Sequence, residues 1–505
     1  MGFFTTLTEA HPPNSRRMML VALVACATIT GTFGYDGSMM NGLNILPSYL
    51  GYFEITTATK SLSTSAIYIG GILAGSTFPY ALNRLGRRMA MLLSAVLTIF
   101  FVALQAGAIN MPMFIAARIG LGYGKACPAL VVPIYLAEAF PPKYRGWVLS
   151  LVCDFYYVGA LIAAGVTYGT FQLTSTWAWR LPSLLQGFWS LLCISVLSFL
   201  PESPRWYAFQ GRNAEGLRAL AQLCSGGDEN DPSVILQFQE ILDTIEFEKT
   251  SDTKQLSIMQ VVRSPSARRR VALAASVAFA TVASGNSIAS YYLGDMLSNA
   301  GITDADTQLQ INVILNAWCL VCSLAGTYYV NSVGRRLDAL VSTVLLTIFL
   351  FLVGAFTKIY GHSDNKSGIY ATVAFVFLFM SSYSVGWTPL CYLYPPEVLN
   401  YTLRSYGMGI TLFVMYGVGL IFVFSIPFAL NDIGWKTYMI NGAWNCLLIL
   451  FIYFFWVETN GKTLEEIDAA FEGRHSDVVI DSAVIKAKLA GAEAEHTLDV
   501  KDRKE

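Results

Sequence analysis

The hexapeptide "NRLGRR" at residues 83–88 lies between two long apolar segments, and a near copy, "NSVGRR", lies in the same kind of position at 331–336. The chain around them is rich in apolar residues: 54% of its 505 residues are hydrophobic, 13% are charged, and the mean hydropathy is +0.50. Such a composition is typical of membrane proteins. We therefore interpret the two hexapeptides as short connections between membrane segments, and their recurrence indicates an internal repeat.

Twelve apolar segments are long enough to cross a bilayer, for which a helix needs about 20 residues. They lie near 18–39, 62–82, 89–108, 113–138, 147–169, 181–200, 271–293, 308–330, 337–357, 368–394, 405–427 and 436–457. The alternating ten-residue pattern of a membrane barrel is absent from the sequence, so backbone hydrogen bonding in hydrocarbon favours helices. The sequence predicts an all-α membrane protein with two groups of six helices.

The distribution of lysine and arginine predicts the orientation of these helices. Cationic residues gather in the connections on one side, including Arg16, Arg17, Arg84, Lys143 and the arginines of both hexapeptides. Because such residues concentrate on the cytoplasmic side, we expect both termini to be cytoplasmic. The expected organisation is a tail at 1–17, a bundle at 18–200, a cytosolic helical linker at 201–269, a bundle at 270–457 and a tail at 458–505. The sequon that begins at Asn365 then lies outside, which makes Asn365 a candidate glycosylation site.

Further matched segments support the repeat. "YLAEAFPPKYRG" at 135–146 and "YPPEVLNYTLRSYG" at 394–407 each place a glutamate seven residues before an arginine. "PESPRWYAFQGR" at 201–212 follows the sixth apolar segment, and "VETNGKTLEEID" at 457–468 follows the twelfth. Three matched pairs at equivalent positions indicate two homologous halves.

Together, these segments and "RIGLGYGKACPALVVPIYLAEAFPPKYRG" at 118–146 resemble the sugar-porter family of the major facilitator superfamily. The resemblance covers nearly the whole chain apart from its ends. "SGNSIASYYL" at 284–293 and "IPFALNDIGWKTY" at 426–438 look like the fungal lactose-permease and cellodextrin-transporter branch. The resemblance implies two six-helix bundles around a central cavity that opens alternately to either side of the membrane.

The charged residues of the matched segments are predicted to form a gate network at the cytoplasmic ends of the helices. Arginine binds carboxylates through charge-assisted, often bidentate hydrogen bonds. If the network lies partly shielded between the bundles, it would favour the outward-open state. Its expected members are Arg87, Arg88, Glu138, Arg145, Glu202, Arg335, Arg336, Glu397, Arg404 and Glu458.

Charged residues within the apolar segments need a partner or water, because an isolated charge in the bilayer is costly. Asp36 and Arg118 lie at similar depth, so we expect them to pair, and the resemblance implies that this pair couples substrate movement to protons. All four histidines lie outside the apolar segments, so no histidine can replace Asp36 in this role. Lys125 and Asp154 also differ little in depth, which leaves two alternatives. Either the two side chains pair, or Asp154 faces the cavity and contacts substrate.

A sugar site needs planar amides and aromatic faces, since hydroxyl groups removed from water must be hydrogen bonded. Several positions where the family has amides instead carry Cys153, Thr281, Val282 and Met415. The predicted substrate-binding residues are Asn286, Tyr291, Tyr292, Asn316, Trp387, Tyr392, Asp154 and Cys153.

These features favour a transporter of a hexose, disaccharide or related glycoside, coupled to protons, in a fungal plasma membrane. One alternative is an exporter or uniporter of a less polar metabolite, which the missing amides favour. Another is a nutrient sensor built on the transporter fold, although the C-terminal tail is short for a signalling domain. The sequence has no nucleophile motif, metal-ligand cluster or phosphate loop, so we expect neither an enzyme nor a cofactor, and we expect a monomer.

Overall fold

The computed structural model describes residues 15–140, 142–250, 265–361, 363, 365–399, 401–460 and 471, and the side chains of Arg145 and Arg404 lie outside this description. Most of the two predicted tails also lies outside it. The chain divides into two compact units, residues 1–460 and 461–505. The fold described below is that of the first unit.

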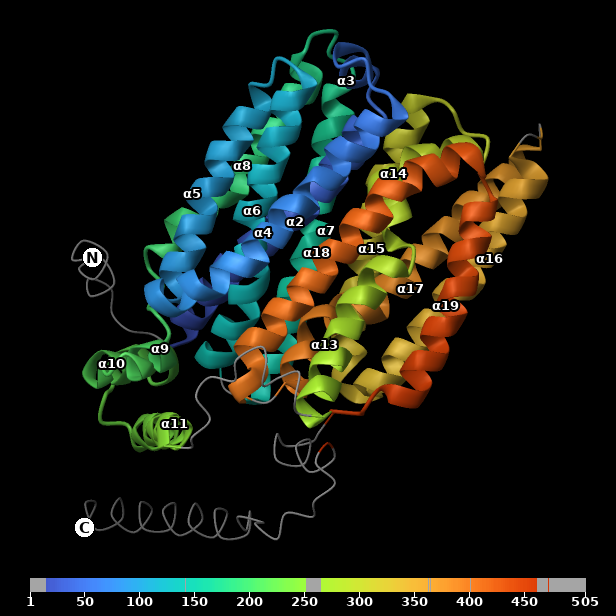
Figure 1. The fold of residues 1–505 in the computed structure, drawn as a ribbon. Coiled ribbons are helices and arrows are strands. Elements are labelled where there is room, and N and C mark those ends of the chain that lie inside the picture. Colours follow the sequence, from blue (N-terminus) through green and yellow to red (C-terminus); the bar gives the residue numbers. More distant parts are fainter. Residues whose placement is uncertain are drawn as a thin grey trace, which may run out of the picture. The chain divides into compact units, whose positions relative to one another are not determined.

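Every element in the described part of the first unit is a helix (Figure 1), and the first bundle corresponds to the first six predicted spans. A short helix, α3 (Pro47–Tyr52), connects α2 to α4. The long helices of the first bundle are α2 (Ser15–Leu43), α4 (Thr57–Leu85), α5 (Arg87–Ala106), α6 (Met111–Ala139), α7 (Pro142–Thr170) and α8 (Trp177–Leu197).

The second bundle corresponds to the last six predicted spans, but it contains seven helices because one span is broken. Its helices are α13 (Pro265–Ala283), α14 (Asn286–Asn299), α15 (Ala305–Val333), α16 (Arg335–Tyr360), α17 (Lys366–Val398), α18 (Tyr401–Asp432) and α19 (Lys436–Phe455). Eleven helices of the described chain are long and apolar enough to cross a membrane, with α13 and α14 taken together. The remaining long helix, α4, carries the buried residues Ser61, Ser63, Thr64 and Ser65.

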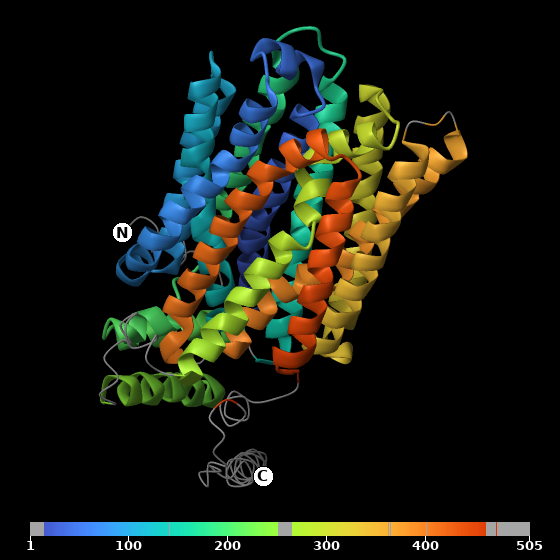
Figure 2. The same cartoon turned by 45° about the vertical axis from the view of Figure 1, so that its right-hand side comes forward.

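In the part of the linker that the structure describes, the chain forms α9 (Pro204–Phe209), α10 (Asn213–Cys224) and α11 (Pro232–Thr250). Leu220 on α10 and Phe238 on α11 belong to a small apolar core of their own. The described residues of the predicted linker therefore include helices that pack against each other. Figures 1 and 2 both place the linker helices at the end of the first bundle opposite α3, and we call these two ends the linker end and the α3 end.

The interface between the bundles follows the repeat. The second long helix of each bundle packs against the fifth long segment of the other, so that α4 contacts α18 and α15 contacts α7. In addition, α2 contacts α14 and α17 contacts α7. This reciprocal pattern is what two homologous halves related by a pseudo-twofold axis produce.

Glycines permit close helix packing at matched places in the two bundles. A Cβ atom on Gly70 of α4 would lie 1.9 Å from the carbonyl oxygen of Ile119 on α6. A Cβ atom on Gly326 of α15 would lie 2.1 Å from the carbonyl oxygen of Val385 on α17. Association of membrane helices depends on such close backbone contact, which larger residues would prevent.

The seventh span breaks between α13 and α14 at Gly285, whose φ of +95° favours glycine. The break leaves carbonyl groups without hydrogen-bond donors from the helix, and two asparagines of α19 donate to these groups instead. Asn441 donates to the Ala283 carbonyl at 3.2 Å, and Asn445 donates to the Ser284 carbonyl at 3.0 Å. The start of α14 at Asn286 is thereby held against α19.

Candidate functional site

A cavity of about 160 Å³ lies between the two bundles. The first bundle contributes residues such as Phe33, Tyr68 and Tyr156 to its lining, and the second contributes Asn286, Tyr291 and Tyr392. A cavity of about 150 Å³ in a protein core holds a molecule the size of benzene. The space in this conformation therefore suits a single-ring molecule rather than a disaccharide.

The cavity wall is rich in tyrosine and poor in amides. Tyrosines on α4, α7, α14, α17 and α18 face it, and Asn286 is the one amide side chain among the described lining residues. Several of these hydroxyl groups already have partners: Tyr157 accepts a hydrogen bond from Ser384 at 2.7 Å, and Tyr68 donates to Tyr291 at 3.4 Å. The wall offers aromatic faces for a ring and hydroxyl groups for its polar substituents.

Asp36 lies directly beside the cavity lining and is almost completely buried. Its Oδ1 atom accepts hydrogen bonds from Arg118 at 2.5 Å and from Gln186 at 3.0 Å. The predicted contact between Asp36 and Arg118 is therefore present. Arg118 also donates to the Ser63 carbonyl at 3.2 Å, which fixes its guanidinium between α4 and α2.

Lys125 forms a second ion pair with the same carboxylate. Its Nζ atom lies 3.0 Å from Oδ2 of Asp36 and 4.9 Å from the centre of the Phe33 ring. Lys125 also lines the cavity, and it is the only charged residue among the described lining residues. The alternative in which Lys125 pairs with Asp154 is therefore contradicted: the two lie at similar depth, but the lysine side chain turns toward α2.

Asp154 lies on the other side of α7, next to Ser323 and Thr327 of α15. It is 1% exposed, and neither carboxylate oxygen has a hydrogen-bond partner in the described structure. It is not among the residues that line the cavity. Its position at the bundle interface differs from the predicted contact with substrate.

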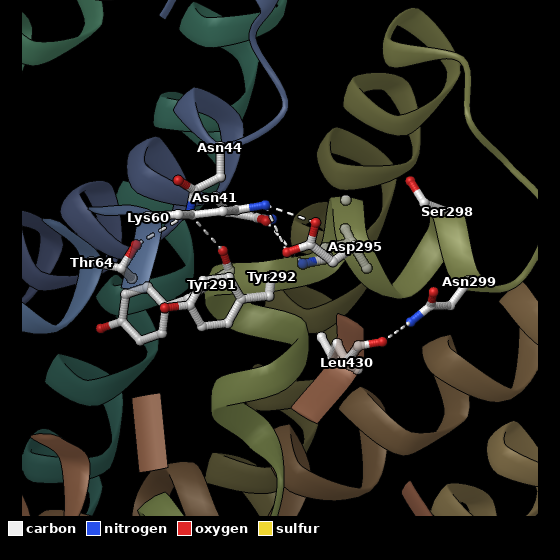
Figure 3. Close-up of polar contacts among 12 residues, drawn as sticks. Asn41, Asn44, Lys60, Thr64, Tyr291, Tyr292, Asp295, Ser298, Asn299 and Leu430 are labelled. Atoms are coloured by element: carbon white, nitrogen blue, oxygen red, sulfur yellow. Dashed lines mark hydrogen bonds and ion pairs between the residues drawn. The ribbon is translucent and has the colours of Figure 1, made fainter. Parts of the chain in front are cut away.

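Polar contacts across the bundle interface close the α3 end (Figure 3). Nζ of Lys60 on α4 lies 2.7 Å from both carboxylate oxygens of Asp295 on α14. Asn44 donates to the Tyr291 carbonyl at 3.2 Å, and the Leu293 amide donates to Asn41 at 3.0 Å. The Leu293 amide is available because the backbone of Tyr292, the preceding residue, leaves the helical region, with φ −133° and ψ 33°.

At the linker end, the arginine hexapeptides form the same structure twice. The Arg87 guanidinium donates to Glu138 at 2.9 and 3.1 Å, and the Arg335 guanidinium donates to Glu397 at 3.1 and 3.3 Å. Each of these ion pairs joins two helices of one bundle. These two arginine–glutamate contacts are among those expected at the ends of neighbouring helices, and neither of them joins one bundle to the other.

Glu202 and Glu458 cap helices that begin in the hexapeptides. Glu202 accepts from the backbone amides of Arg87 at 2.8 Å and of Arg88 at 3.0 Å. Glu458 accepts from the amides of Arg335 at 2.9 Å and of the next residue, Arg336, at 3.1 Å. The sequence predicted contacts from the guanidinium groups. The amides take this place because the first turn of a helix leaves its N–H groups unpaired and carries a partial positive charge.

The structure places the predicted substrate residues in two groups. Four of them line the cavity: Cys153, Asn286, Tyr291 and Tyr392. The other four lie outside the lining, at Asp154, Tyr292, Asn316 and Trp387. Tyr292 donates to the Val423 carbonyl at 2.9 Å, Trp387 donates to Thr343 at 3.2 Å, and Asn316 donates to Ser38 at 3.4 Å, so each of these three forms a helix-to-helix contact.

Sequence reasoning missed Tyr68, Tyr416 and Phe33, which all line the cavity. Aromatic residues are common on membrane helices, so nothing in the local sequence separates these three from residues that pack against lipid. Thr281, Val282 and Met415 also line the cavity, as their match to the family's amide positions implied. Asn365, the candidate glycosylation site, is exposed and caps α17 by accepting from the Gly368 amide at 3.3 Å.

Comparison with known proteins gives the same classification in sequence and in structure. Residues 21–471 match the sequence model of a family described as "Sugar (and other) transporter". The chain is 28% identical to the MFS-type transporter oryC of Aspergillus oryzae, over 90% of this chain and 86% of that protein. It is 26% identical to a high-affinity glucose transporter of Kluyveromyces lactis, over 90% of this chain and 85% of that protein.

The fold is similar to that of XylE, a proton:xylose symporter from E. coli. The TM-score is 0.77 at 20% sequence identity, over 91% of this chain and 100% of XylE. The predicted arrangement of the spans in two bundles is thereby confirmed as the fold of the major facilitator superfamily.

Proposed function

The chain belongs to the sugar transporter family, and from this premise we propose that it carries a single-ring sugar, or a close derivative of one, through the central cavity by alternating access. The observation that carries the proposal is the cavity itself. Both bundles contribute to its wall, and polar contacts between the bundles close it toward the α3 end. A relative rotation of the bundles that breaks those contacts would open it to that side.

The linker end is proposed to be cytoplasmic, because the arginine-rich connections lie there. The conformation described here is then the one that is closed to the outside. A plasma-membrane location and a monomeric state complete the proposal, and Asn365 then faces the outside. The gate network holds the helix ends of each bundle together, so that each bundle moves as one body.

Proton coupling is proposed to act through Asp36. This carboxylate touches the guanidinium of Arg118 and lies beside the cavity lining, so its charge state can affect both the substrate and the packing of α2 against α6. Protonation would release the arginine and lower the cost of moving the pair during the conformational change.

Reconstituted uptake tests this function. Purified protein in liposomes, given labelled monosaccharides and an inward proton gradient, is expected to accumulate at least one of them above its external concentration. Asp36→Asn is expected to retain exchange of labelled for unlabelled sugar and to lose gradient-driven accumulation, with rates normalised to folded protein. Accumulation that ignores the proton gradient in the unsubstituted chain would refute proton coupling, and absence of transport for every sugar would refute the proposed substrate.

A second candidate function is export or uniport of a less polar metabolite. It is favoured by Cys153, Val282 and Met415, which present apolar or weakly polar groups to the cavity. The same liposomes distinguish the two candidates. If the second is correct, an aromatic or terpenoid probe would be transported, whereas monosaccharides would not.

A further inference from the structure

The charges around Asp36 do not balance. One carboxylate contacts two cations, Arg118 at 2.5 Å and Lys125 at 3.0 Å. All three residues are buried, with side chains 0–5% exposed. The other ionisable groups that face Asp36 are the phenols of Tyr156 and Tyr291, which are uncharged near neutral pH. The cluster therefore carries one excess positive charge.

No second acid compensates this charge in the described structure. The charged groups that act on Lys125 are Asp36 and Arg118. Asp154, the other acid of this bundle's interior, faces Ser323 and Thr327 on α15 instead. An uncompensated charge on buried side chains is unfavourable, so an arriving anion would be strongly attracted.

The excess charge lies where a ligand can reach it. Lys125 lines the cavity, together with Phe33, over whose ring its ammonium lies. An ammonium group has three N–H donors, and its nitrogen lies 3.0 Å from one carboxylate oxygen of Asp36. The rest of the described lining offers neutral hydroxyl, thiol and amide groups.

From this geometry we infer that the substrate carries a carboxylate, which binds the Lys125 ammonium and neutralises the Asp36–Arg118–Lys125 cluster. A carboxylate supplies the missing negative charge, whereas a neutral hexose could only accept a hydrogen bond. The cavity of about 160 Å³ limits the rest of the ligand to one ring, and the tyrosine wall suits a hydroxylated ring. The expected class is a sugar acid of the uronate type. This inference rests on the proposed function, since it names the substrate class of the same cavity.

Matched ligand pairs test the inference. Glucose and glucuronate differ only at C6, as do galactose and galacturonate, so each pair compares a hydroxymethyl group with a carboxylate on one ring. Binding to the purified full-length chain would be measured by calorimetry at neutral pH. We expect at least one uronate to bind about tenfold or more tightly than its neutral partner, the gain of one charge-assisted hydrogen bond.

Substitutions then locate the selectivity. Lys125→Met removes the charge with little change in length and is expected to abolish the preference for the uronate, while Lys125→Arg is expected to retain it. Lys60→Met is the matched control, because Lys60 pairs with Asp295 and does not line the cavity; it is expected to keep the preference. Thermal melting of each variant verifies that it is folded.

The outcomes separate this inference from the function on which it rests. If neutral hexoses bind as tightly as their uronates to the unsubstituted chain, the inference is overturned and sugar transport stands. A uronate preference that survives in folded Lys125→Met also overturns it. If none of the four ligands binds, the inference fails, and the uptake assay with other monosaccharides decides the proposed function.

Discussion

Glu202 accepts a hydrogen bond at 2.8 Å from the backbone amide of Arg87, so a residue from the start of the linker caps a helix more than 100 positions earlier in the chain. Gly86 precedes this helix with a φ of +88°, and a Cβ atom there would lie 2.5 Å from Oε2 of Glu202. Gly334 and Glu458 repeat the arrangement in the second bundle. The φ of Gly334 is +91°, and a Cβ atom there would lie 2.8 Å from Oε2 of Glu458. The motif thus requires glycine for two reasons, backbone conformation and space for the capping carboxylate.

Gly86→Ala is therefore expected to destabilise the protein through both causes. Strain at positive φ costs about 1–3 kcal/mol, and displacing the carboxylate adds to it. Gly211→Ala provides the control, because Gly211 has a φ of +76° but nothing lies within 4 Å of the added Cβ atom. Thermal melting in detergent should show a clearly larger decrease for Gly86→Ala. Equal decreases would mean that the contact with Glu202 adds nothing.

The two buried aspartates of the first bundle should respond in opposite ways to the same substitution. Asp36 and Asp154 are each 1% exposed, but only Asp36 contacts cations. Asp36→Asn leaves the positive charges of Arg118 and Lys125 without a carboxylate, which should cost about 3 kcal/mol. Asp154→Asn removes a carboxyl group that has no hydrogen-bond partner and should leave the melting temperature unchanged or higher. A large loss for Asp154→Asn would reveal a stabilising partner.

Sequence reasoning succeeded where one physical cost dominates. The bilayer penalty for an unpaired charge, together with depth along the helices, was enough to predict the contact between Asp36 and Arg118. The same depth argument left two alternatives for Asp154, a pair with Lys125 or a position facing the cavity, and the structure shows neither, because depth does not specify which face of a helix a side chain occupies. The correct contact depends on how α6 and α7 are rotated relative to each other, and that rotation depends on packing between helices.

Two other features could not be read from local sequence for related reasons. The break at Gly285 lies within a continuous apolar segment, so length and hydropathy predict one helix where the structure has two. Opposite charge suggested that Glu202 would bind arginine side chains, whereas it binds backbone amides that become available only at a helix N-terminus. Both features depend on where a helix ends rather than on residue type.

The matched caps Glu202 and Glu458 should show opposite pH dependence. Burial raises the pKa of Glu202. Burial also acts to raise the pKa of Glu458, but hydrogen bonds from backbone amides, first that of Asn460 and then that of Arg335, lower it overall. Glu202 therefore contributes less to stability as pH rises through its raised pKa, whereas the contribution of Glu458 grows as pH rises toward the ordinary glutamate range.

Melting temperatures of Glu202→Gln and Glu458→Gln, measured against the unsubstituted protein between about pH 4 and pH 7, test this difference. The loss caused by Glu202→Gln should shrink as pH rises, because the substituted chain lacks the titrating group. The loss caused by Glu458→Gln should grow over the acidic part of the range. Parallel trends would contradict the opposite shifts.

The ion pair between Lys60 and Asp295 should bias the protein toward closure at the α3 end, because it joins α4 of one bundle to α14 of the other at 2.7 Å. Its side chains are 15% and 34% exposed, so solvent screening limits its contribution to about 1 kcal/mol or less. Lys60→Ala is then expected to increase the open population by up to about fivefold.

A cysteine at Ser290, which lines the cavity, would report this change through its rate of labelling by a bulky, membrane-impermeant maleimide added from the α3 side. The chain without this substitution gives the background from its nine native cysteines. The double variant Lys60→Asp with Asp295→Lys restores the pair in reverse and should return labelling to the slow rate, since the attraction depends on opposite charge and not on direction. Labelling that stays slow in Lys60→Ala would show that the neighbouring hydrogen bonds of Asn41 and Asn44 are sufficient to hold the α3 end closed.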